Sequence, residues 1–285
     1  MGFKALAVMM KFSLREVRRK KVLIAGGVLT GAFLLVFVLG LHFINGQIHG
    51  RGFEEIVGFQ FFSLGLYAAT FLIVVIAAFA GVSAVSGEIE TGTAHGLLAN
   101  PVPRSQILLG KFLGYALLLG VYDAAVLFSI WGATVWQLGV VIPGVFEILP
   151  LMFLETLTML ALSFLGSVLF SSLANGITVF LLYGVALLGG MVEQVGALAR
   201  GLSENTVTAL INAGIITSLI LPVDALYRRS IYLASSKTGA VPNILHNLGP
   251  FGSLSVPSVW MEVYAVVYLG VCLAAATFLF SRKDI

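Results

Sequence analysis

Six stretches of this sequence are long and apolar enough to cross a lipid bilayer. A membrane-spanning helix needs roughly 20 consecutive apolar residues, and inside lipid its backbone groups must all be bonded within the chain. Hydrophobic residues make up 59% of the chain and charged residues only 10%, against about 25% charged residues in a typical soluble domain. We therefore predict an all-α, polytopic membrane protein with one transmembrane domain over residues 1–285. Its six predicted spans are 22–44, 63–83, 112–138, 148–171, 175–195 and 259–280.

The distribution of lysine and arginine predicts the orientation of these spans. Residues 1–21 contain seven basic residues and one acid, Glu16, and the chain ends with Arg282 and Lys283 close together. Segments rich in Lys and Arg near the ends of spans stay in the cytoplasm. We therefore expect a multi-pass protein of the inner (cytoplasmic) cell membrane, with both termini and the 84–111 segment in the cytoplasm.

Residues 1–21 have the pattern of an amphipathic helix on the cytoplasmic membrane surface. Helical periodicity places Phe3, Leu6 and Met10 along one face and basic residues such as Lys4 and Lys11 along another. Such a helix lies in the lipid interface with its cations toward anionic headgroups. The alternative is a basic tail that is merely solvated.

Residues 196–258 form a long external segment in this topology, although they contain basic residues such as Arg228 and Arg229. Long translocated segments follow the positive-inside rule weakly. Within the segment, residues 209–221 are apolar and end before Pro222. The run is too short to span a bilayer, so we expect a re-entrant or interfacial helix between spans five and six. A further span is the alternative.

The 84–111 segment is a polar insert between two apolar runs. Glu88 and Glu90 follow the second span, and a Gly92-Thr93 pair can then interrupt the helix. Leu97 and Leu98 fit a short helix of two turns, which Pro101 ends because the residue before a proline disfavours helix. The insert predicts a short helix held across the cytoplasmic face, able to dock into a partner and to pass force to spans two and three.

The insert and the chain's end together resemble a known family. The segments that carry the resemblance are the Gly-Glu-Ile-Glu-Thr-Gly-Thr run at 87–93, Leu97-Leu98, Pro101, Arg104, Gly110-Lys111 and the final Phe280-Ser-Arg-Lys-Asp-Ile. They resemble the first cytoplasmic loop and the C-terminus of the ABC transporter type-2 permeases. The details are similar to the NosY-like branch, which is associated with maturation of nitrous oxide reductase.

The resemblance implies the membrane-spanning permease subunit of an ATP-driven exporter whose substrate it does not identify. Its implied partners are a cytosolic ABC ATPase subunit, which binds ATP and Mg, and a second permease copy in a homodimer. The 84–111 segment would be the coupling loop that contacts the ATPase. The residues that the resemblance assigns to this coupling are Glu88, Glu90, Gly92, Thr93, Leu97, Leu98, Pro101 and Arg104.

The sequence lacks the motif of a nucleotide site. No G-x-x-x-x-G-K-[ST] phosphate loop occurs in it, and that motif is what cradles the phosphates in P-loop ATPases. We therefore expect no enzymatic activity, catalytic residue or cofactor in this chain itself. One cysteine and four scattered histidines give no metal-binding spacing. The basic residues gather at the N-terminus, which gives no reason to expect a nucleic-acid partner.

Asp123 and Glu155 lie inside the third and fourth predicted spans, and Glu193 and Glu262 lie near span ends. Ionisable groups inside a membrane are costly and are functional candidates by default. We expect Asp123 and Glu155 to line a translocation route whose acidic outer half favours a cationic or metal-bearing substrate. The alternative is that both are protonated or hydrogen-bonded groups that serve packing. An alternative function is an ion-coupled secondary transporter that uses these two acids.

Overall fold

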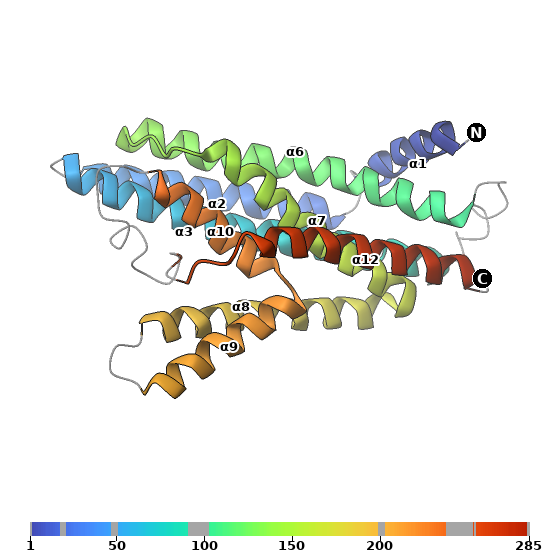
Figure 1. The fold of residues 1–285 in the computed structure, drawn as a ribbon. Coiled ribbons are helices and arrows are strands. Elements are labelled where there is room, and N and C mark those ends of the chain that lie inside the picture. The colour runs from blue at the N-terminus through green and yellow to red at the C-terminus, as the bar shows by residue number, and fades with distance from the viewer. Residues whose placement is uncertain are drawn as a thin grey trace.

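The computed structural model describes residues 2–17, 21–46, 51–90, 103–198, 203–237, 253 and 255–283. All regular structure in these ranges is helical (Figure 1). The helices are α1 (Gly2–Val17), α2 (Lys21–Asn45), α3 (Arg51–Val82), α4 (Ser86–Glu90), α6 (Arg104–Leu138), α7 (Val145–Leu169), α8 (Ser172–Leu198), α9 (Glu204–Ile220), α10 (Val223–Ser236) and α12 (Trp260–Arg282).

Six helical stretches in the described ranges are long and apolar enough to cross a membrane, which confirms the predicted fold. They are Lys21–Asn45, Glu54–Glu90, Arg104–Leu138, Val145–Leu169, Ser172–Leu198 and Trp260–Arg282. The second is longer than the apolar run 63–83, because α3 begins at Arg51. Phe59 and Phe62 are completely buried in this extension. The segment lies before the apolar run and would be assigned to a loop from the sequence, but packing against the bundle stabilises it as a helix.

Both chain termini lie at the same end of the bundle (Figure 1). We call it the terminal end, and it also holds the facing ends of α4 and α6. The opposite end, which we call the far end, holds the turn between α6 and α7. Gly139 and Gly144 both have positive φ there, 68° and 77°, a backbone conformation that glycine adopts without steric cost. This short turn sets α6 and α7 side by side.

The N-terminal helix packs directly on α6. A Cβ atom at Gly114 would lie 2.9 Å from the Met10 carbonyl oxygen and 3.3 Å from the Leu14 nitrogen. The two helix backbones therefore approach closely, which small residues permit. Ser13 is completely buried in this contact, whereas Val8 and Phe12 are exposed. The helix thus presents apolar side chains on a face that α6 does not cover.

α9 and α10 form a sharply bent pair after α8. The bend between them is 109°, at Leu221 and Pro222. α9 starts where α8 ends, at the far end, and α10 runs back toward that end (Figure 1). Lys237, just after α10, forms an ion pair with Glu147 of α7. The pair is therefore longer than the apolar run 209–221, and it enters the bundle and leaves it at the same end.

The centre of the bundle is formed by α3, α6 and α7, which pack on one another. α2, α8 and α12 lie outside them and expose large apolar side chains. Those on α2 include Ile24, Val28, Leu29, Leu35, Val36 and Phe43. Faces of this kind are stable against lipid or against another membrane helix.

Candidate functional site

Lys111 joins α6 to the chain just after α3 at the terminal end. Its side chain is 1% exposed. The ammonium group forms an ion pair with Glu88 of α4 and donates a 3.0 Å hydrogen bond to the Ala84 carbonyl. A buried ammonium is stable only when its charge is paired and its protons are bonded. Lys111 therefore fixes the helix ends on either side of residues 91–102.

Glu90, the last residue of α4, binds the start of α8. Its carboxylate accepts hydrogen bonds from the Ser172 backbone N–H at 2.8 Å and from the Ser172 hydroxyl at 2.9 Å. The first N–H groups of a helix have no partner within the helix, and a negative charge there also interacts favourably with the helix dipole. The hydroxyl groups of Ser86 and Ser172 lie 2.9 Å apart in the same contact.

Arg104, the first residue of α6, binds the chain's C-terminal residues. Its guanidinium donates a hydrogen bond to the Lys283 carbonyl. The Lys283 ammonium in turn donates a 2.6 Å bond to the Val168 carbonyl near the end of α7. The terminal end is thus cross-linked by polar contacts that join α6, α7 and the residue after α12.

Three of the predicted coupling residues, Glu88, Glu90 and Arg104, lie at the helix ends that flank residues 91–102. Their side chains bind other helices of the bundle, as just described. The other five, Gly92, Thr93, Leu97, Leu98 and Pro101, lie outside the described residues. The assignment of all eight to ATPase coupling stays a prediction.

Asp123 on α6 and Glu155 on α7 are both buried in the interior, 0% and 1% exposed. The Thr156 hydroxyl, on the residue that follows Glu155 in α7, donates a 3.2 Å hydrogen bond to Asp123 Oδ1. Asp123 Oδ2 and Glu155 Oε2 have no hydrogen-bond partner within the described part of the chain. The two acids therefore come together, as the translocation-route hypothesis requires, but burial alone fits the packing alternative equally.

Arg228 on α10 is the centre of a second buried polar cluster. Its Nη1 and Nη2 atoms lie 2.7 Å and 2.9 Å from the two carboxylate oxygens of Glu193 on α8. Its Nε atom donates a 2.9 Å bond to Asp224, four residues earlier. It also donates to the Ser218 hydroxyl of α9 at 3.3 Å and to the Ser255 carbonyl at 3.2 Å. One guanidinium, 1% exposed, therefore ties together α8, α9, α10 and the segment before α12.

The sequence alone does not reveal this cluster, because Arg228 lies outside the apolar runs, in the segment predicted to be external. The six predicted spans contain no Lys or Arg that could pair with Glu193 and Glu262. Glu193 pairs with Arg228, and Glu262 pairs with Arg229 at 2.9 Å. The available signal was the spacing of Asp224 and Arg228, since an acid four residues before an arginine is a stabilising pair on a helix.

A small cavity with a mixed polar and apolar lining lies beside this cluster, with a volume of about 10 Å³. That is near the smallest volume that holds one water molecule. Its polar lining comes from Asp224 and from the side chains of Tyr67, Thr70, Tyr183 and Tyr227. The Tyr67 and Tyr227 rings meet edge to face, with centroids 5.2 Å apart. In the described ranges no group of three or more His, Cys, Asp or Glu residues is arranged to hold a metal ion.

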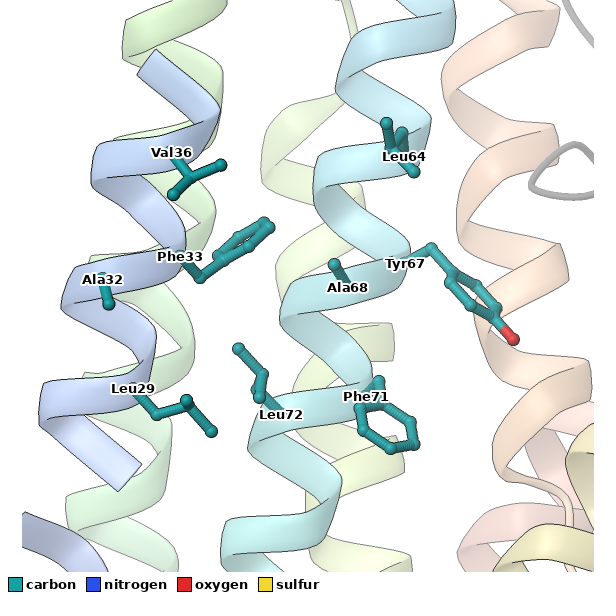
Figure 2. Close-up of a pocket in the computed structure, with 9 residues that line it drawn as sticks. All are labelled: Leu29, Ala32, Phe33, Val36, Leu64, Tyr67, Ala68, Phe71 and Leu72. Atoms are coloured by element: carbon teal, nitrogen blue, oxygen red, sulfur yellow. The ribbon is translucent and has the colours of Figure 1, made fainter. Parts of the chain in front are cut away.

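An open apolar groove of about 580 Å³ lies on the outer face of α2 and α3 (Figure 2). Its lining residues are Leu29, Ala32, Phe33, Val36, Leu64, Tyr67, Ala68, Phe71 and Leu72. The lining has no charged side chain. Tyr67 lines both the groove and the small cavity, and in Figure 2 its hydroxyl points away from α2.

Comparison with known proteins gives a consistent result. The sequence model of the family described as ABC-2 family transporter protein matches residues 7–285. A probable ABC transporter permease protein NosY from Stutzerimonas stutzeri is 29% identical over 233 residues, which cover 75% of this chain and 77% of that protein. A protein with the same description from Pseudomonas aeruginosa is 49% identical over 53 residues, 19% of each chain. These similarities confirm the resemblance to type-2 permeases and to their NosY-like branch.

Proposed function

Because this chain belongs to the ABC-2 family of transporter proteins, we propose that it couples ATP hydrolysis by a separate cytosolic ATPase subunit to export of a substrate. The chain is a membrane-spanning permease subunit of an ABC transporter. In the proposal, ATP and Mg bind to the ATPase, and two permease copies form a homodimer in the inner membrane. Both termini and residues 84–111 face the cytoplasm.

The observation that best supports this proposal is the polar cross-linking at the terminal end. A loop that receives force from an ATPase must be attached firmly to the spans that it moves, because packed helices transmit strain with little compression. Lys111, Glu90 and Arg104 provide such attachments on both sides of residues 91–102. Helix α1, which contains Lys4, Lys11 and Arg15, lies at the same end (Figure 1), and this agrees with a cytoplasmic location.

Replacing Leu97 and Leu98 together by aspartate is expected to reduce ATPase association strongly while leaving membrane insertion intact. These leucines are apolar residues in a polar segment, and burying one leucine side chain is worth about 1.5–3 kcal/mol. A loss of that size corresponds to at least about a tenfold decrease in affinity. The measurement is the amount of co-expressed ATPase that a tagged permease retains in mild detergent.

The matched control adds the same two charges to the segment without removing the leucines, as His95→Asp with Asn100→Asp. This variant should retain most of the ATPase. A wild-type permease that is functional and monodisperse without any ATPase would contradict the proposed function itself. Equal ATPase recovery from both double variants would contradict only the role of the leucines.

Asp123 and Glu155 are proposed to line the translocation route. Asp123→Asn and Glu155→Gln should then impair export, while ATPase assembly and basal ATP hydrolysis stay near the wild-type level because the terminal end is unchanged. The measurement is rescue of a strain that lacks the permease gene, compared with Glu147→Gln at the exposed far end. If the acids serve packing instead, the isosteric variants keep export, and alanine variants lose about 1–3 kcal/mol of stability through unsatisfied partners.

A further inference from the structure

The turn between α7 and α8 is bonded from two separate directions at the terminal end. Leu169 ends α7 and Ser172 begins α8, so only two residues connect these helices. On one side of the turn, Glu90 and Ser86 of α4 bind Ser172. On the other side, the Lys283 ammonium binds the Val168 carbonyl. The turn is therefore held both by the chain that precedes residues 91–102 and by the C-terminal tail.

The tail also links the turn to the chain that follows residues 91–102. Arg104 begins α6 immediately after this segment and donates to the Lys283 carbonyl. The path from α6 to α7 is thus Arg104, the Lys283 backbone, the Lys283 ammonium and the Val168 carbonyl. The residues on both sides of 91–102 are therefore bonded to the same turn. Glu90 binds the turn directly, and Arg104 is connected to it through Lys283 of the tail.

The two helices joined by this turn carry the buried acids of the interior. α7 holds Glu155, and α8 holds Glu193, which is bound to Arg228. Helices are stiff along their axes, so a displacement at Ser172 or Val168 moves the backbone at these acids as well. Other polar bonds join these helices to α3: the Asn175 side chain of α8 donates to the Val82 carbonyl, and the Ser163 hydroxyl of α7 donates to the Ala78 carbonyl. The Glu90 and Lys283 connections differ from these because they start at the residues next to 91–102 and at the tail.

We infer that the α7–α8 turn is a second input of the coupling movement, and that Glu90 and Lys283 are the positioning residues that deliver it. This inference rests on the proposed coupling of residues 84–111 to an ATPase. The Glu90–Ser172 contact and the Arg104–Lys283–Val168 contacts connect the turn in parallel, so single and double variants should differ. Loss of either one leaves the other in place, whereas loss of both removes the charged contacts of the turn and leaves the weaker Ser86–Ser172 and Asn175–Val82 contacts.

The test uses the full permease assembled with its ATPase, and compares Glu90→Ala, Lys283→Ala and the double variant. The readout is ATP hydrolysis by the complex relative to the isolated ATPase. We expect a modest decrease for each single variant and at least about a fivefold decrease for the double variant, the lower range of coupling between distant sites. Lys283→Arg keeps the cation and should restore activity in the Glu90-intact background.

The matched control removes a cross-helix ion pair of α7 at the opposite end, as Glu147→Ala with Lys237→Ala. It should hydrolyse ATP like the wild type. Pull-down of the ATPase and the midpoint of thermal unfolding are measured for every variant, because a merely structural role would lower them in step with activity. The inference is overturned if the Glu90/Lys283 double variant keeps wild-type activity, or if its loss matches that of the control. A failure of the ATPase to bind the wild-type permease would instead reject the proposed function.

Discussion

Arg228→Ala is expected to lower the free energy of unfolding by about 3–5 kcal/mol, because it leaves buried carboxylates without their cation. Glu193 and Asp224 both bind this guanidinium, and they are only 4% and 6% exposed. Loss of the guanidinium also removes the bonds to Ser218 and Ser255. The measurement is equilibrium unfolding of the purified permease in mixed micelles.

The adjacent arginine supplies the matched control. Arg229 pairs with Glu262, but the two side chains are 15% and 32% exposed, so Arg229→Ala should cost clearly less than Arg228→Ala. Arg228→Lys keeps the charge and loses the two-pronged geometry of the guanidinium, and should fall between them. Combining Arg228→Met with Glu193→Gln and Asp224→Asn removes all three charges and should recover much of the loss. Equal effects of the two alanine variants would contradict the central role of Arg228.

The fold class could be predicted from the sequence because lipid imposes a simple requirement. A chain with long apolar runs must bond every backbone group internally, which leaves helices of nearly fixed length. The observed α7, α8 and α12 accordingly lie within a few residues of the predicted spans. The N-terminal end of α3 was missed because Glu54, Glu55 and Gln60 interrupt its hydropathy. Burial of Phe59 and Phe62 against neighbouring helices, which no local pattern shows, determines it.

The candidate site could be predicted only in part, because its contacts join residues that are far apart in sequence. Glu88, Glu90 and Arg104 stood out as charges in a recognisable segment. Their pairing did not stand out, because only the folded bundle brings Ser172 to Glu90 and Lys283 to Arg104. In the same way, Arg228 looked like a loop arginine, because the bend at Pro222 that returns α10 to the bundle is a tertiary feature.

The Arg228 cluster also explains why α9 and α10 stay in the bundle despite their polar residues. α10 has Asp224, Arg228 and Arg229 within its first two turns, so its insertion between apolar helices would be costly without partners. The charges are satisfied by Glu193 from α8 and Glu262 from α12. This arrangement requires α8 and α9 to approach closely enough for Ser218 and Glu193 to reach one guanidinium.

Gly214→Ala is expected to destabilise the protein by about 1–3 kcal/mol, the usual cost of forcing extra atoms into a packed interior. A Cβ atom at Gly214 of α9 would lie 2.7 Å from the Gly189 carbonyl oxygen and 2.3 Å from the Glu193 Cβ atom on α8. The Gly189 carbonyl is part of the α8 backbone, and the Glu193 Cβ atom is bonded directly to that backbone. Neither atom can therefore move away by a side-chain rotation. α8 and α9 must separate, which pulls Glu193 from Arg228. The loss should therefore appear together with weakened Arg228 contacts, measured as faster amide hydrogen exchange in α10.

Gly184 on α8 is the matched control, because a Cβ atom there would meet nothing within 4 Å. Alanine in a helix is more favourable than glycine by about 0.5–1 kcal/mol, so Gly184→Ala should leave stability unchanged or raise it slightly. The same chemical change on neighbouring helices is thus expected to act in opposite directions, and the sign depends only on the distance to the facing backbone. If Gly214→Ala were as stable as Gly184→Ala, then α8 and α9 would have room to move apart without disturbing Glu193. That result would show that Glu193 is held at Arg228 by something other than the close packing of α8 and α9.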